Sequence, residues 1–143
     1  AIEVKDMSRF RALNDLQIDI SPKFSMLGLL IYQNLDNGLS ENNKLNWYSV
    51  GLRPSYHFSR YFSLLAEIGL DYSSQLGATD GSLIKLTIAP QIAPLNKILS
   101  RPAIRAYFTY AIWSDSFIGQ VAPLSYGDKN HGMSFGIQME SWW

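Results

Sequence analysis

The feature that most constrains this chain is an alternation of apolar and polar residues through several long segments. Between Tyr48 and Phe58, every second residue is apolar, aromatic or proline, and the positions between them hold Ser, Gly, Arg and His. Because successive side chains of a β-strand point to opposite faces of a sheet, this period of two predicts a strand with one apolar face. The alternation returns in the segments at residues 61–73, 82–92, 102–113 and 131–143.

Turn signals divide the chain into about seven such segments, which predicts an all-β, antiparallel fold. The first three segments cover residues 9–20, 24–33 and 45–58. The connections alternate between short and long, beginning with the short turn Ser21-Pro22-Lys23. Short periplasmic turns and longer external loops are typical of antiparallel barrels of the outer membrane. The first and last segments would then both run toward the periplasm.

The apolar faces of the third to seventh segments carry no charged residue, whereas the opposite faces mix bulky, basic and polar groups. A basic residue that faces lipid at the midplane costs roughly 2–4 kcal/mol, so a bilayer would select such apolar faces. Aromatic residues near the segment ends resemble the two girdles of a transmembrane β-barrel. They are Tyr48, Tyr72 and Tyr110 toward the external end, and Tyr56, Phe58, Phe62 and Trp143 toward the periplasmic end.

Other interpretations of the pattern stay open. A soluble β-sandwich also has alternating strands, although its strands are usually about 5–6 residues long. Residues 61–73 taken alone could form a helix, because Ser63, Glu67 and Asp71 have helical spacing. Pro54 and Pro90 fall inside expected strands, and a closed barrel has no edge to accept them. We therefore expect these two prolines at bulges or near strand ends.

Composition argues against several other classes of protein. Twelve basic and twelve acidic residues cancel, which gives no electrostatic reason to expect a nucleic-acid partner. Cys is absent, and His57 and His131 lack the spacing of a metal site. No nucleophile elbow or phosphate loop is present, so we expect neither an enzyme nor a cofactor. Glu67 and Asp71 would lie roughly 13 Å apart on one strand, too far for the usual glycosidase pair.

The last nine residues, from Phe135 to Trp143, closely resemble the ending of maltoporin-type sugar porins. Four further stretches are similar to strands of that family in the same order, namely residues 48–56, 66–72, 84–91 and 100–111. The resemblance covers the chain from about residue 45 to the end. It implies an eighteen-stranded barrel in outer-membrane lipid, assembled as a homotrimer. Sugars such as maltose, maltodextrins or another oligosaccharide would cross it by passive diffusion.

Seven strands are fewer than eighteen, so the resemblance implies that residues 1–143 form one porin domain that is a C-terminal fragment or a partial barrel. Residues 1–6 have neither the basic nor the apolar region of a signal peptide. We therefore expect that the signal has been removed or that the chain begins partway through a protein. An open sheet edge in lipid leaves backbone groups unsatisfied, so we expect that this chain alone does not form the pore.

The resemblance also implies a strip of lumenal aromatic residues on which sugar rings stack. Trp142 matches this strip, and its alternative role is that of a periplasmic-rim aromatic. The family usually has Trp before the Ser-Arg-Pro motif, but this chain has Leu99 there. An aliphatic side chain has no flat face on which a sugar ring could stack. This departure points to another sugar or to a general diffusion porin. Polar side chains beside the strip would satisfy the sugar hydroxyls. The lumenal candidates are Arg53, Glu67, Asp71, Lys85, Gln91, Arg105 and Tyr107.

Overall fold

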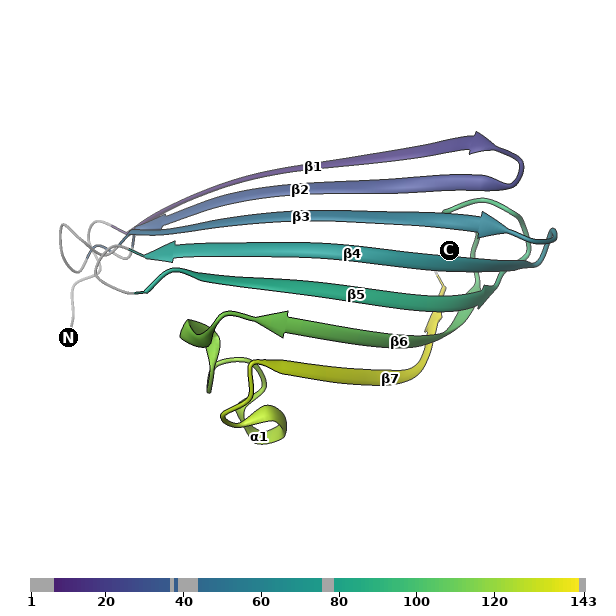
Figure 1. The fold of residues 1–143 in the computed structure, drawn as a ribbon. Helices are drawn as coiled ribbons and strands as arrows, with labels where there is room; N and C mark the ends of the chain where they lie inside the picture. The colour runs from purple at the N-terminus through teal and green to yellow at the C-terminus, as the bar shows by residue number, and fades with distance from the viewer. Residues whose placement is uncertain (1–6, 37, 39–43, 76–78, 142–143) are drawn as a thin grey trace.

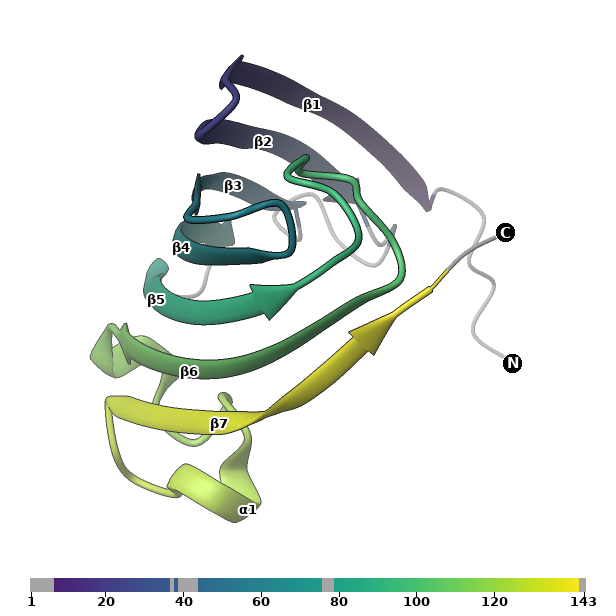
Figure 2. The ribbon, with the colours of Figure 1, turned by 90° about the vertical axis from the view of Figure 1, so that its right-hand side faces the viewer.

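A computed structural model describes residues 7–36, 38, 44–75 and 79–141. In this part of the chain, seven strands form one antiparallel sheet in which each strand pairs with the next (Figure 1). The strands are β1 (Ser8–Ser21), β2 (Phe24–Asp36), β3 (Lys44–His57), β4 (Phe62–Gln75), β5 (Gly81–Ile92), β6 (Ala103–Trp113) and β7 (His131–Glu140). The predicted all-β antiparallel fold is confirmed. The described sheet is curved but not closed, and β1 and β7 are its edges (Figure 2).

The longest connection contains the helices of the described chain. Between β6 and β7 lie a 3-10 helix, η1 (Asp115–Phe117), and a single helical turn, α1 (Pro123–Tyr126). Within the described residues, no helix combines the length and apolarity needed to cross a bilayer. Residues 61–73, which could have been helical by spacing alone, lie almost entirely in β4.

Each strand pair keeps a single register over nearly its whole length, so residues paired across neighbouring strands direct their side chains to the same face of the sheet. Leu30, Val50 and Leu70 are direct cross-strand neighbours on the convex face, and each is between 41% and 54% exposed. Between the ends of β3 to β7, the described residues of this face include no charged side chain. The predicted apolar face is therefore continuous from strand to strand.

Aromatic rings form two rows near the opposite ends of the strands. At the end of the long connections, four rings on adjacent strands have successive centroid distances of 6.2, 5.0 and 6.3 Å, in the order Phe10, Tyr32, Tyr48 and Tyr72. At the end of the short turns, three rings follow one another at 4.8 and 5.6 Å, in the order Tyr56, Phe58 and Phe62. These positions match the two predicted girdles; Trp143 lies outside the described residues.

The two strand prolines interrupt the hydrogen-bond ladder without shifting its register. Pairing between β3 and β4 lapses at Pro54, and pairing between β5 and β6 lapses at Pro90, because proline has no N–H to donate. Both ladders resume in the same register beyond the proline. Pro54 lies three residues before the end of β3, and Pro90 lies two before the end of β5. The expected position near strand ends is confirmed, and neither ladder has a bulge there.

The connection between β5 and β6, residues 93–102, crosses the concave side of the sheet. Figure 2 shows it rising from the end of β5 toward β2 before it returns to β6. Asn96 Nδ2 donates a hydrogen bond of 2.7 Å to the carbonyl oxygen of Pro22, in the β1–β2 turn. The sequence predicted only a turn here. The crossing could not be read from the sequence, because its contact joins residues 74 positions apart.

Buried polar side chains hold β1, β2 and β3 together at the same end of the sheet. Ser25 Oγ donates to Asp19 Oδ1 at 2.6 Å and lies 2.9 Å from His57 Nε2. Ser25 is fully enclosed, and His57 is only 3% exposed. Ser55 lies directly opposite Ser25 and is equally enclosed, but its Oγ has no hydrogen-bond partner among the described residues. The two serines therefore differ in bonding and not in burial.

We expect Ser25→Ala to lower the free energy of unfolding by about 1–3 kcal/mol, because it leaves Asp19 and His57 without their shared hydroxyl. Ser55→Ala is the matched control and should be neutral or slightly stabilising, since that hydroxyl bonds to no described residue. Urea unfolding of the two variants in lipid vesicles measures the difference. Equal losses in both variants would contradict the role assigned to Ser25.

Candidate functional site

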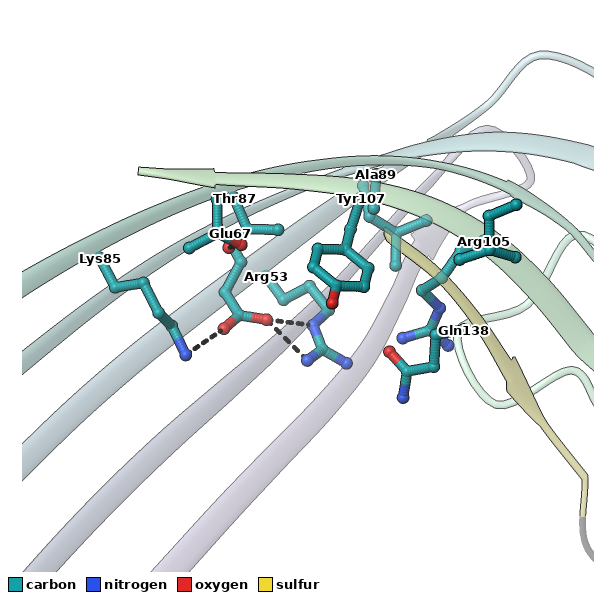
Figure 3. A pocket seen from close by; sticks show the side chains of 11 residues that line it. Arg53, Glu67, Lys85, Thr87, Ala89, Arg105, Tyr107 and Gln138 are labelled. Carbon is teal, nitrogen blue, oxygen red and sulfur yellow. Dashed lines mark hydrogen bonds and ion pairs between the residues drawn. The ribbon is translucent and has the colours of Figure 1, made fainter. Parts of the chain in front are cut away.

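The concave face holds a pocket of about 410 Å³ that opens over β3 to β7 (Figure 3). Five of the predicted lumenal residues line it: Arg53, Glu67, Lys85, Arg105 and Tyr107. They come from four adjacent strands, and each occupies the polar face that the alternation assigned to it. Volumes of this size are typical of small-molecule sites, which are about 300–1,000 Å³. The structure thus brings most of the predicted candidates into one place.

Glu67 is shared by two basic side chains that line the pocket with it. Arg53 Nε and Nη2 both donate to Glu67 Oε2, at 2.9 and 2.6 Å. Lys85 Nζ lies 3.5 Å from the other carboxylate oxygen, Oε1. Figure 3 shows the carboxylate between the two cations, all three pointing into the hollow of the sheet. Arg53 and Lys85 keep 31% and 46% of their side chains exposed, so a solute can reach them.

A second shared carboxylate, Glu140, lies where β6 and β7 meet the β5–β6 connection. Glu140 Oε2 accepts a hydrogen bond of 2.9 Å from Arg105 Nη2 and forms an ion pair with Arg101 Nη2. Only 7% of the Arg105 side chain and 8% of the Arg101 side chain are exposed. Buried guanidinium groups are costly unless an anion neutralises them, so Glu140 makes their burial possible.

Tyr107 and a pair of threonines form the uncharged part of the pocket. Tyr107 lies opposite Gly136, where an added Cβ would come within 2.9 Å of the tyrosine Oη. The absence of a side chain at Gly136 therefore lets the ring lie across β7. Thr87 and Thr109 join their hydroxyls at 2.7 Å on the neighbouring strands. The pocket thus offers a flat ring, hydroxyl groups and charges within one wall.

The remaining predicted candidates lie elsewhere on the polar face. Asp71 accepts a hydrogen bond of 3.1 Å from Trp47 Nε1, and the guanidinium of Arg11 lies 5.7 Å from the Trp47 ring centroid. This cluster lies four residues along β4 from Glu67 and does not line the pocket. Gln91 is buried opposite Arg105. Trp142 lies outside the described residues, and its predicted role stays a prediction.

Sequence reasoning did not single out three residues that complete the site. Glu140 and Gln138 belong to the polar face of the last segment, and Arg101 belongs to the Ser-Arg-Pro motif. The alternation placed Glu140 and Gln138 on the lumenal face, so this signal could have found them. Arg101 follows no strand periodicity, and its approach to Glu140 depends on how the β5–β6 connection folds. Among the described residues, no group of three or more His, Cys, Asp or Glu side chains could hold a metal ion.

A curved up-and-down sheet whose convex face carries no charge between the ends of β3 to β7, and whose concave face is charged, has the arrangement of a porin wall. The protein-family model described as LamB porin matches residues 2–143. The chain therefore belongs to the LamB porin family, as the resemblance in its C-terminal strands predicted. The match also covers residues 2–44, where that resemblance was weak. This family consists of outer-membrane transport channels.

The two shared carboxylates should differ strongly in their effect on stability, because their cationic partners differ in exposure. We expect Glu140→Gln to cost about 3–5 kcal/mol of unfolding free energy, since it removes the carboxylate that two buried guanidinium groups share. Glu67→Gln is the matched control and should cost only about 0–1 kcal/mol, because its partners are exposed to water. Urea titrations of both variants in the same lipid measure the difference. Similar losses would contradict the structural role of Glu140.

Proposed function

We propose that this chain forms part of the wall of an outer-membrane barrel through which sugars pass by passive diffusion. The observation that carries the proposal is the pocket on the concave face, in which Tyr107 lies among charged and hydroxyl side chains. A pyranose ring presents C–H groups that an aromatic face can cover, while its hydroxyls need donors and acceptors in place of water. Membership of a porin family supports this assignment.

The apolar convex face would contact lipid, and the two aromatic rows would mark the membrane surfaces. Tilted transmembrane strands need about 9–11 residues, and the strands here have 10 to 14. A closed barrel would need further strands beside β1 and β7, because an open edge in lipid leaves backbone groups unsatisfied. We propose that the closed barrel assembles as a homotrimer, as the family resemblance implies.

A general diffusion porin without sugar selectivity is the second candidate function. Leu99 favours it, because an exposed aliphatic side chain occupies a position where the sugar porins usually stack a ring. This residue is 46% exposed and lies in the β5–β6 connection. Tyr107 and Trp142 favour a sugar channel. Sugar block of the channel current distinguishes these two functions.

The membrane assignment predicts losses of stability of very different size at two neighbouring positions in the middle of β3. Val50→Lys would place a charge on the convex face and should lower stability in lipid by about 2–4 kcal/mol. Ser49→Lys is the control, because its side chain would lie on the concave face opposite Asp71 and should cost much less. Urea unfolding in phospholipid vesicles measures both. A loss at Ser49 as large as that at Val50 would contradict the assignment of the faces.

Single-channel recording in a planar bilayer, using protein purified from outer membranes, tests the proposed transport. We expect maltotriose to interrupt the current of the wild-type channel. Trp142→Ala should raise the half-blocking concentration by about tenfold, as loss of one stacking contact would, while the open-channel conductance stays near normal. Tyr107→Leu provides a second test on a described residue. A current that maltotriose does not block would favour the general diffusion porin.

A further inference from the structure

The charges around the pocket do not balance. Arg53 and Lys85 line it and share one carboxylate, Glu67, whereas Arg105 lines it and pairs with Glu140. Two basic groups and one acidic group leave the Glu67 cluster with one excess positive charge, although the whole chain is neutral.

Two carboxylates elsewhere on the concave face, Asp71 and Asp19, do not offset this excess. Asp71 lies four residues along β4, roughly 13 Å from Glu67, and bonds to Trp47 beside Arg11. Asp19 bonds to Ser25 at the turn of the first hairpin. At physiological ionic strength the Debye length is about 8 Å, so these carboxylates are largely screened from the pocket. The excess positive charge is therefore local.

Arg53 and Lys85 have hydrogen-bond donors that their contacts with Glu67 do not use. Arg53 directs Nε and Nη2 to Glu67, and no described residue accepts a hydrogen bond from its Nη1. Lys85 contacts Glu67 through one long ion pair of 3.5 Å, and its side chain is 46% exposed. An ammonium group can donate three hydrogen bonds, so most of this capacity is unused.

We propose that this pocket is a subsite for the anionic group of an acidic sugar, either a carboxylate or a phosphate ester. Arg53 and Lys85 would bind the anion through charge-assisted hydrogen bonds, which are about twice as strong as neutral ones. Tyr107, Thr87 and Thr109 would contact the ring and its hydroxyls. The inference rests on the proposed sugar channel and narrows its substrate class to sugars that carry a negative charge.

The test compares half-blocking concentrations of four solutes on single channels of the protein purified from outer membranes. The solutes are glucose, glucuronate, glucose 6-phosphate and inorganic phosphate, and maltotriose is recorded in parallel. We expect the two acidic sugars to block at concentrations about tenfold lower than glucose does, with inorganic phosphate no better than glucose. The two acidic sugars distinguish a carboxylate site from a phosphate site. The preference should shrink in 1 M salt, where the Debye length falls to about 3 Å.

Lys85→Gln keeps hydrogen-bonding capacity but removes the charge, and it should reduce the preference for acidic sugars over glucose by about fivefold. Lys44→Gln is the matched control, because this lysine lies at the start of β3 and pairs with Asp36 outside the pocket. It should leave the preference unchanged.

The possible outcomes test the acidic-sugar subsite and the sugar channel separately. Block by maltotriose with no preference for acidic sugars would overturn the acidic-sugar subsite and leave the sugar channel standing. Block by inorganic phosphate as strong as that by glucose 6-phosphate would overturn the sugar part of the assignment. Block by no solute would overturn both the channel proposal and the subsite.

Discussion

The backbone hydrogen-bond ladder that joins β1 to β7 determines which side chains share a face. Because each pair of strands keeps one register, a residue's place in the alternation of one strand fixes its neighbours on the next two. A slip by one residue would place Arg53 or Glu67 on the apolar face. The continuity of the convex face and the grouping of the pocket residues both follow from this register.

The charged groups on the concave face have two physical roles that differ in their exposure to water. Glu140 lies against two enclosed guanidinium groups, so its main effect is to make the junction between β7 and the β5–β6 connection stable. Glu67 lies between two cations that water reaches, so its effect on folding is small. Arg53 and Lys85, the cations beside Glu67, therefore keep hydrogen-bond donors that a solute can reach. Burial, and not residue type, separates structural ion pairs from those that can bind a ligand.

The sequence predicted the strands and, in the third to seventh segments, the faces of the side chains, because these depend on a local period of two. It placed Arg53, Glu67, Lys85, Arg105 and Tyr107 on one face, and the register brings them together. The folding of residues 93–102 could not be predicted, since irregular backbone follows no period. The ion pair of Arg101 was missed for the same reason. Asp71 shared the predicted face but lies too far along its strand to join the pocket.

The hydrogen bond from Asn96 to Pro22 has a consequence for the order of folding. In a flat sheet, four strand spacings of about 4.8 Å would hold the two connections roughly 19 Å apart along the sheet. The bond can therefore form only after the intervening strands have paired and the sheet has curved. Hairpins with local contacts form early, whereas a contact across 74 residues waits for them. This bond distinguishes a wall that has reached its final curvature from a looser stack of the same hairpins.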